Sequence, residues 1–380
     1  MRHAKNGGWK LLGFLLMLFL VGCLEEYTPP VTAAQTALLV VDGFINSQGI
    51  TTIKLSRTAS LTTTAAPPPE TKATVFIEDA AGQRQTLPET SPGTYASAPL
   101  MLDPAKKYRL HLRTAAGPEY ASDLQPVLTT PPIDNLYWTA DGDGASIYVD
   151  AHAAANVPPF YRWDFVETWE FTSAFLTDIE YKNGRIVPRT EDVYRCWATA
   201  NSTKINVLST TTLSENTIRR HAITVVPRSS VKLYYKYSIL VKQRVQSKEE
   251  YDYLTLLKKN TEDIGSIFGP LPVQLTGNMH ALANADEPVI GYVGVGAETQ
   301  KRIFISRGEL PREWRPSAGL AEQCTTPDTI DDVRRFNGGN PLPIRRLEAG
   351  EPRAGSYLGA GAVCIDCRLS GTNVRPSFWQ

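Results

Sequence analysis

The sequence predicts a mainly β protein, with an N-terminal β-sandwich, a second, larger β-sandwich domain that contains one helix, and a cysteine-stapled C-terminal tail. Three observations support this fold class. Short apolar stretches alternate with turns rich in glycine and proline along most of the chain. The aromatic residues are mostly tyrosine and tryptophan, and together with many threonines and valines they favour strands. One segment near residues 248–260 stands out for its helical spacing of apolar residues.

Residues 1–22 have the composition of a secretory signal peptide. A basic start is followed by an apolar run, residues 11–21, that is too short to span a bilayer. Small residues then precede Cys23, as in a bacterial lipobox, where the cysteine is acylated and becomes the new N-terminus. We therefore expect a lipid on Cys23 to anchor the protein to a membrane. An ordinary signal peptide with an incidental cysteine is the alternative.

Residues 23–36 are predicted to be the acylated cysteine and a flexible tether. Glu25 and Glu26 resemble the acidic tag that sends Bacteroidota lipoproteins to the outer face of the outer membrane. The alternative is a solvated acidic start to the tether. Residues 28–36 are rich in proline, threonine and alanine, which suits a stalk. We expect the body to face the cell exterior, with a periplasmic location as the other possibility.

Residues 37–130 predict an immunoglobulin-like or prealbumin-like sandwich. Its strands are short, and turns with glycine or proline separate them. In residues 51–56 the apolar Ile53 and Leu55 alternate with polar residues, which is typical of a half-buried strand. The expected strands are residues 38–45, 51–56, 73–78, a strand after the turn at 91–95, and 108–113.

The second β-rich domain is predicted to cover residues 131–307, beginning at the Pro131-Pro132 boundary. Asp141-Gly-Asp-Gly144 favours a hairpin turn, although its first residues also resemble a calcium loop. The expected strands are residues 133–138, 145–150, 161–171, 222–227, 232–243, 289–295 and 302–306, the last two closing the domain.

The strand at residues 161–171 alternates aromatic and polar residues. Tyr161, Trp163 and Phe165 would occupy one face, either as core packing or as a platform on which carbohydrate stacks. Glu167 and Glu170 would lie on opposite faces, so they could not act as a pair of catalytic carboxylates.

A capping box predicts where the helix begins. Ser247 is the expected N-cap and Glu250 the N3 residue, followed by apolar residues at helical spacing. We expect the face formed by Tyr251, Leu254 and Leu257 to pack on the second sheet, with partner binding as the alternative.

Residues 308–380 are expected to be loop-rich and to depend on cysteines for order. Cys196, Cys324, Cys364 and Cys367 remain once Cys23 carries lipid, and an even number in an oxidising compartment predicts two disulfides. Four cysteines allow three pairings, and the sequence does not choose among them. The alternatives are zinc binding or a redox centre at Cys364-Ile-Asp-Cys367, and free thiols.

The sequence offers no recognisable catalytic motif. The full chain has 39 basic and 39 acidic residues, and three of the basic residues belong to the signal. No basic patch suggests nucleic acid. The histidines beyond the signal are isolated from one another: His111, His152, His221 and His280. We therefore expect no enzyme activity, no cofactor and no metal.

Several segments resemble a known family in order along the chain. They are Val40-Val-Asp-Gly-Phe-Ile45, Ile53-Lys-Leu-Ser-Arg57, Pro131-Pro-Ile-Asp134, residues 161–171, Gly277-Asn278, Gly291-Tyr292 and Cys364 to Trp379. Together they look like the Bacteroidota lipoprotein family catalogued as domain of unknown function 4249. The resemblance covers nearly all of the chain after the signal, and its most specific part is the terminal segment.

The resemblance implies an outer-membrane lipoprotein, often encoded near TonB-dependent receptors. A surface-exposed, non-catalytic accessory or ligand-binding subunit of such a β-barrel transporter is the leading hypothesis. Phe378 and Trp379 would either plug the body or dock a partner. The alternatives are an adhesin or structural envelope protein, and a hydrolase whose site is assembled across the fold.

Overall fold

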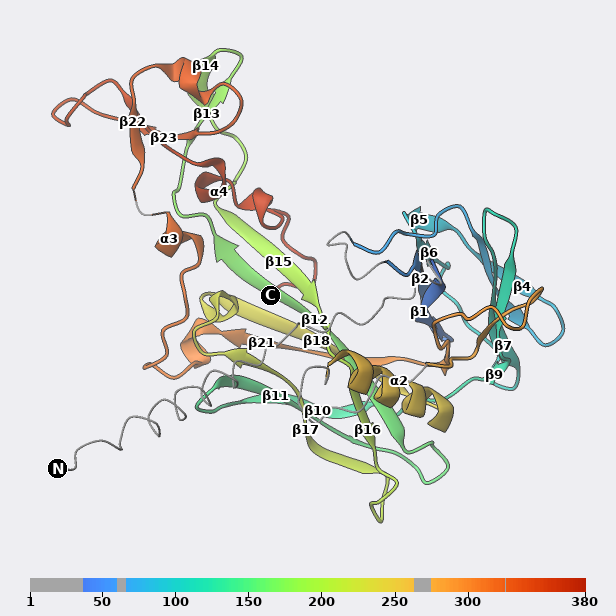
Figure 1. Cartoon of the computed structure of the whole chain (residues 1–380). Helices are drawn as coiled ribbons and strands as arrows, with labels where there is room; N and C mark the ends of the chain where they lie inside the picture. Colours follow the sequence, from blue (N-terminus) through green and yellow to red (C-terminus); the bar gives the residue numbers. More distant parts are fainter. Residues whose placement is uncertain (1–36, 60–65, 263–274, 325) are drawn as a thin grey trace, which may run out of the picture.

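The computed structural model describes residues 37–59, 66–262, 275–324 and 326–380. The signal peptide, Cys23 and the tether predicted for residues 23–36 lie outside these residues. The predicted fold class is confirmed: the chain is mainly β, and most of its sheets are antiparallel (Figure 1). Two sandwiches and a small C-terminal lobe make up the described part.

The first sandwich has two facing sheets, with strand orders β20-β1-β2-β6-β5 and β19-β8-β7-β3-β4. Their inward side chains form one core, in which Ile53 and Leu55 are buried as the alternation predicts. The strands from the N-terminal part of the chain are β1 (Leu39–Asn46), β2 (Thr52–Arg57), β3 (Thr74–Asp79), β4 (Arg84–Leu87), β5 (Glu89–Ser91), β6 (Thr94–Ala96), β7 (Lys107–Arg113), β8 (Glu119–Ser122) and β9 (Gln125–Pro126), which pairs with β7.

The prediction that residues 289–295 close the second domain is wrong. This segment runs parallel to β1 of the first sandwich, with Ile45 N–H donating to the Gly294 carbonyl at 2.9 Å. It ends in β20 (Val295–Gly296), while β19 (Met279–Ala281) pairs with β8. An apolar strand looks the same in sequence whichever sheet it joins, and its partner here lies far back in the chain. The first sandwich is therefore completed by residues that follow most of the second.

Gly277 and Gly291 permit a close crossing inside this returning segment. A Cβ atom on Gly277 would lie 1.7 Å from the Gly291 carbonyl oxygen, and one on Gly291 would lie 2.3 Å from the Val41 carbonyl oxygen. The next residue, Asn278, donates to the Val293 carbonyl at 3.0 Å and accepts from Val293 N–H at 2.8 Å. Only residues without a side chain fit where backbones approach this closely. The crossing therefore fixes the segment against β1.

The second sandwich packs a three-stranded sheet, β10-β11-β17, against a sheet of order β15-β12-β18-β21 in which β16 also pairs with β12. Asp141 accepts from the backbone N–H groups of Asp143 and Gly144, so the predicted hairpin turn is confirmed. The strands are β10 (Ile133–Ala140), β11 (Gly144–His152), β12 (Phe160–Thr172), β15 (Arg195–Asn201), β16 (Asn206–Ser209), β17 (Thr217–Pro227), β18 (Lys236–Val245) and β21 (Thr299–Ser306).

The aromatic face of β12 belongs to the core. Tyr161 and Trp163 are both 0% exposed, so they cannot form a surface on which carbohydrate stacks. Trp163 Nε1 donates to Gln243 Oε1 at 2.9 Å, which satisfies the indole inside the core. Phe165 is only partly buried. The core-packing interpretation is thus confirmed for the first two aromatic residues.

Helix α2 (Lys248–Thr261) begins where the sequence predicts. Ser247 Oγ accepts from Glu250 N–H at 3.1 Å, which is half of a capping box. The Glu250 side chain turns inward instead of closing the box, and it accepts from Gln246 Nε2 at 2.8 Å. Tyr253 is buried against Tyr292 of the returning segment, while the predicted Tyr251 contacts Phe160 and is only partly buried. The helix therefore contacts both sandwiches.

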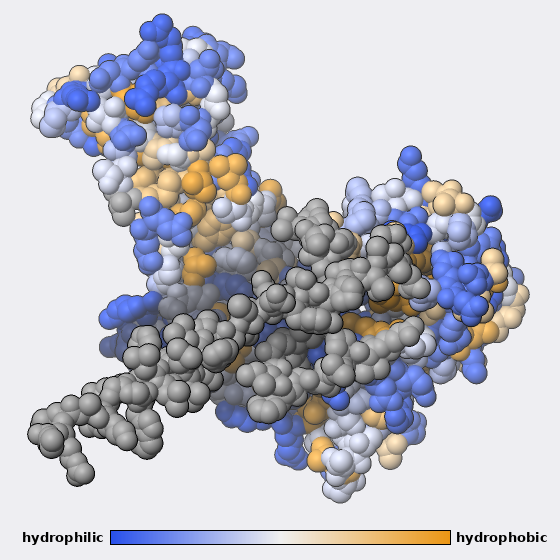
Figure 2. Space-filling model, in the orientation of Figure 1, coloured by the Kyte–Doolittle hydropathy of each residue, from blue (hydrophilic) through white to orange (hydrophobic). Residues whose placement is uncertain are grey.

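The C-terminal lobe lies at the end of the long β12 and β15 strands, at the upper left of Figure 1. It combines the hairpin of β13 (Ile179–Lys182) and β14 (Arg185–Pro188) with a sheet of β22 (Asp328–Ile330), β23 (Leu342–Arg346) and β24 (Tyr357–Ala360). Three short helical elements come before β22 in the chain: η2 (Val231–Leu233), η3 (Arg307–Glu309) and α3 (Leu320–Gln323). Three more follow β22: η4 (Val333–Phe336), α4 (Ala362–Ile365) and η5 (Cys367–Leu369). Figure 2 shows polar surface at the tip of the lobe and apolar surface at its base.

Candidate functional site

A cleft between the two sandwiches is the candidate site, and we name it the inter-sandwich cleft. The outward face of β1 and β2 forms one wall, and the outward face of β12 and β18 forms the other. Its volume is about 400 Å³, which is within the range of small-molecule sites. The lining residues are Asp42, Gly43, Phe44, Asn46, Ile50, Thr52, Lys54, Arg162, Asp164, Phe165, Val166, Asn201, Ser202, Lys242, Arg244 and Glu298.

The wall from the first sandwich follows directly from strand alternation. Leu39, Val41 and Ile45 of β1 point into the core, so Asp42 and Asn46 point outward. Asp42 lies opposite Lys54 of β2 in the antiparallel register. No hydrogen bond or ion pair joins either side chain to another described residue. Both charges therefore remain available on this wall.

The wall from the second sandwich has two arginines side by side. Arg162 of β12 pairs in register with Arg244 of β18, and Asp164 pairs with Lys242. Like charges placed opposite each other on a sheet repel. Asp164 relieves this repulsion by accepting from both guanidinium groups, from Arg162 Nη2 at 3.1 Å and from Arg244 Nη2. One carboxylate thus forms ion pairs with two arginines.

Arg244 also connects the two sandwiches. Its guanidinium lies 4.4 Å from the centre of the Phe44 ring, on the facing wall. Its side chain is only 9% exposed. Burial by itself raises the pKa of Asp164, but the charges of Arg244 and Arg162 outweigh that effect and hold the pKa below its usual value. The wall is therefore ionised at neutral pH.

A buried carboxyl lies behind this wall. Glu250 of α2 is 6% exposed, and burial raises its pKa above the usual value although Arg244 acts in the opposite direction. A Cβ atom on Gly294 would lie 2.3 Å from Glu250 Oε2, so the returning segment packs directly on the carboxyl. Glu250 therefore contributes less negative charge than the carboxylates that face the cleft.

Hydrogen bonds fix the junction beside the cleft. The Pro131 carbonyl accepts from Gln243 Nε2 and from Thr299 Oγ1, each at 3.0 Å. Thr130 Oγ1 donates to the Ala297 carbonyl at 2.7 Å and accepts from Val245 N–H at 3.0 Å. Residues 130–131 and 297–299, at two of the places where the chain passes between the sandwiches, are thereby bonded to each other or to β18. This gives the cleft a defined shape without a bound ligand.

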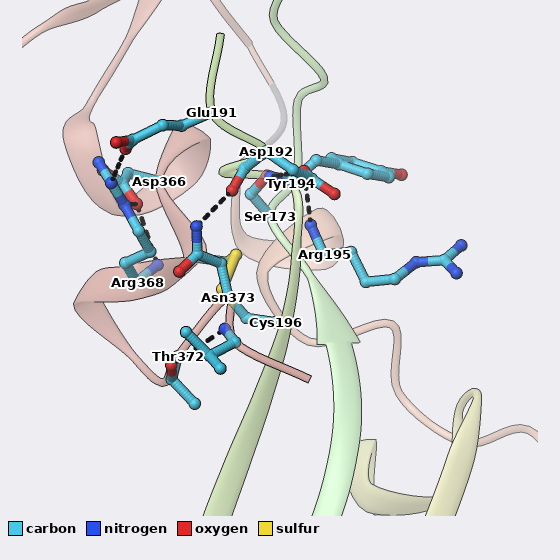
Figure 3. Close-up of a disulfide and its surroundings, with 12 residues drawn as sticks. Ser173, Glu191, Asp192, Tyr194, Arg195, Cys196, Asp366, Arg368, Thr372 and Asn373 are labelled. Carbon is cyan, nitrogen blue, oxygen red and sulfur yellow. Dashed lines mark hydrogen bonds and ion pairs between the residues drawn. A yellow bond between two sulfur atoms is a disulfide. The ribbon is translucent and has the colours of Figure 1, made fainter. Parts of the chain in front are cut away.

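The four cysteines form two disulfides, Cys196–Cys367 and Cys324–Cys364. The two cysteines of Cys364-Ile-Asp-Cys367 thus bond to different partners, and neither is a free thiol for zinc or for redox exchange in this state. Figure 3 shows the disulfide of Cys196 in β15, whose partner is Cys367 in the tail. Beside it Asn373 donates to the Asp192 carbonyl at 2.9 Å, and Arg368 pairs with Glu191 at 2.6 Å.

The end of the tail packs on the body. Thr372 exchanges two backbone hydrogen bonds with Trp197 of β15. Trp379 is 6% exposed and contacts the rings of Trp197 and Phe304 at centroid distances of 6.4 and 5.7 Å. Phe378 is 37% exposed, with the Arg302 guanidinium 3.6 Å from its ring centre. Trp379 therefore occupies the position of a plug, and docking of a partner on Phe378 stays a prediction.

We expect Trp379→Ala to lower the free energy of unfolding by about 3 kcal/mol, because a buried indole leaves a cavity. Phe378→Ala is the matched control and should cost less than about 1 kcal/mol, since its ring is partly solvated. Urea denaturation followed by circular dichroism measures both. Equal losses for the two variants would contradict the assignment of Trp379 as the plug.

The four histidines in the described residues each have a partner that accounts for them. His152 pairs with Asp134 at 2.7 Å and His280 with Asp123 at 3.2 Å. His111 lies between Glu78 and Glu119, and His221 contacts Asn206 at 2.8 Å while burial lowers its pKa to about 4. In the part of the chain that the structure describes, no group of three or more histidine, cysteine, aspartate or glutamate side chains could hold a metal ion. Nor is any described helix long and apolar enough to cross a membrane.

The inter-sandwich cleft was not predicted from the sequence. Arg162 and Asp164 were assigned only to the polar face of a strand, and nothing connected them with Asp42 or Lys54. The one available signal was two outward-facing strands with unusual charge, residues 161–164 and 242–244. A single sequence does not indicate that these faces meet.

The similarity to a solved structure is weak. A chain titled "Cytokine receptor complex - Crystal form 2" is similar over 54% of this chain and 91% of that chain, at 13% identity and a TM-score of 0.20. A likeness at this TM-score carries no argument about fold or function. No curated protein matches the chain in sequence.

A family model matches residues 24–302, which is most of the chain. The match includes both walls of the inter-sandwich cleft, the junction at Pro131, and the crossing at Gly277 and Gly291. It ends before the segment from Cys364 to Trp379, so the part of the resemblance expected to be most specific lies outside it. The chain belongs to the family described as Domain of unknown function (DUF4249).

Proposed function

We propose that this protein is a lipid-anchored accessory subunit of an outer-membrane transporter and that it holds a ligand in the inter-sandwich cleft. The cleft is the observation that carries the proposal. Its walls come from two sandwiches whose junction is hydrogen-bonded, and charged and amide side chains line it. Binding sites commonly lie at such junctions between domains. The protein would act by binding, with no chemical step of its own.

The second part of the proposal concerns the lipid anchor and the cellular location of the protein. A lipid on Cys23 would hold the body at the outer membrane, facing the cell exterior. Two disulfides support an oxidising compartment, because such bonds are rare in reducing cytosol. The acidic Glu25 and Glu26 favour the outer face, as the sequence predicts. A TonB-dependent β-barrel is the expected partner.

Protease shaving of intact cells tests the location. We expect the body to be degraded in intact cells that make the wild-type protein. The Cys23→Ala variant should be missing from the membrane fraction, since it has no residue to acylate. Protection of the wild-type body until the cells are lysed would refute the external location.

Affinity purification from detergent-solubilised outer membranes tests the partnership. The wild-type protein should recover a β-barrel receptor in a stable complex. A variant with the same tag but with Cys23→Ala controls for membrane proteins that adhere during solubilisation. Recovery of no stable partner in repeated purifications would refute the accessory role.

A further inference from the structure

The charges in the inter-sandwich cleft are not balanced. Its cationic side chains are Lys54, Arg162, Lys242 and Arg244, and its anionic side chains are Asp42, Asp164 and Glu298. Lys242 and Glu298 pair with each other at 3.7 Å. Asp164 is shared by two arginines, so its one negative charge faces two positive charges. The cleft therefore has a surplus of one positive charge.

The surplus is also one of hydrogen-bond donors. Lys54 is exposed in the cleft, and no acceptor among the described residues pairs with its Nζ. The Nε atoms of Arg162 and Arg244 also have no acceptor there, but they are buried, so the donors that face a ligand are Lys54 Nζ and the Nη atoms of Arg162, whose side chain is 22% exposed. Guanidinium and ammonium groups donate hydrogen bonds and accept none. Both walls contribute: Lys54 comes from β2 and Arg162 from β12. A ligand that supplies an acceptor carrying negative charge would complement both walls at once.

The carboxylates limit how much negative charge the ligand can carry. Asp42, Asp164 and Glu298 line the same space of about 400 Å³, and they would repel a phosphate dianion. A ligand with a single carboxylate would neutralise the one surplus positive charge of the cleft. The remaining lining supplies neutral polar groups from Asn46, Asn201, Ser202 and Thr52. These amides and hydroxyls suit a ligand body that bears hydroxyl or amide groups.

We propose that the inter-sandwich cleft binds a small monocarboxylate whose body carries hydroxyl or amide groups. A sugar acid and a short peptide share this chemistry. The carboxylate lies between Lys54 and Arg162, and the body contacts the amide and hydroxyl groups on both walls. Phe44 is covered by Arg244, and Phe165 packs against the core of the second sandwich, so the contacts available to the ligand are mainly polar. This inference rests on the proposed binding role and names its ligand class.

Isothermal titration calorimetry on the full chain purified in detergent micelles tests the proposal. The probes are D-glucuronate and N-acetyl-glycylglycine, each with its uncharged match, D-glucose and N-acetyl-glycylglycinamide. We expect at least one carboxylate to bind saturably and its uncharged match to bind roughly tenfold more weakly, because a hydrogen bond to a charged group is lost. Which of the two binds distinguishes a sugar acid from a peptide.

Lys54→Gln is the test variant, because Lys54 is exposed and has no partner whose loss would disturb the fold. It should weaken binding of the carboxylate roughly tenfold and leave the weak binding of the uncharged match unchanged. Lys107→Gln is the matched control, an exposed strand lysine of the same sandwich outside the cleft, and it should have no effect.

Three outcomes would overturn the ligand class. They are equal binding of a carboxylate and its uncharged match, equal loss in the two lysine variants, and no saturable binding of either carboxylate up to about 10 mM. These results are separable from the accessory role, because co-purification with a receptor does not depend on them. Carboxylate binding without a receptor would conversely leave the ligand class standing.

Discussion

Replacing Cys196 and Cys367 together by serine should lower the free energy of unfolding by about 5 kcal/mol. The bond joins residues that are 171 positions apart, so it removes a large amount of chain entropy from the unfolded state. It also holds the tail, with Trp379, against β15 and Phe304. Its loss should therefore expose Trp379 as well as destabilise the fold. Urea denaturation gives the free energy. The chain has seven tryptophans, so the tail is followed by the difference in emission between proteins with and without a Trp379→Phe substitution.

The second disulfide supplies the matched control. Cys324 and Cys364 are 40 positions apart, so replacing both by serine should cost about 4 kcal/mol and leave Trp379 buried. A larger loss from this pair than from Cys196 and Cys367 would contradict the loop-length argument. An unchanged emission spectrum in the Cys196→Ser, Cys367→Ser variant would show that the tail holds its place without the bond.

Arg244→Ala should destabilise the protein by about 3 kcal/mol, because removing one partner of a buried ion pair leaves the other uncompensated. Asp164 would keep only Arg162, and the charge that opposes the raised pKa of Glu250 would be lost. The contact with Phe44 across the cleft would also disappear. Because this contact joins the sandwiches, we expect the unfolding transition to broaden.

Lys242→Met controls for the loss of a cation from the same face of the same strand. Lys242 is 32% exposed and lies 3.7 Å from Glu298, so its removal should cost less than about 1 kcal/mol. Scanning calorimetry measures both variants. The proposed role of Arg244 would be wrong if the two variants lost the same stability.

Local patterns predicted the elements well where neighbours in sequence decide the structure. The alternation around Ile53 and Leu55 gave the inward face of β2, and Ser247 gave the start of α2. The interaction of Glu250 was missed because its side chain responds to Arg244 and Gly294, which lie outside the helix. Short-range rules describe backbone propensity, and burial of a side chain depends on what packs over it.

Pairings between residues far apart in the chain could not be predicted from the sequence for a related reason. The sequence of residues 289–295 does not determine whether this segment pairs with β1 or with β21, because each of those strands has an edge that an apolar strand could join. The number of disulfides followed from an even count of cysteines, but their pairing required the fold. The inter-sandwich cleft is the extreme case, because it exists only where the outer faces of two separate sheets meet. In the sequence, its charged residues cannot be distinguished from ordinary solvent-exposed residues on the outer face of a sheet.

The late return of the chain to the first sandwich has a consequence for how the protein acquires its structure. Ile45 pairs with Val295, 250 positions later, so the edge of β1 stays open while the intervening sequence is made. Folding with contacts this distant is slow, and an open strand edge invites pairing with other chains. The N-terminal half should therefore need protection from aggregation during biosynthesis. Residues 275–297 close that edge, so the first sandwich is complete only after β20 has paired with β1.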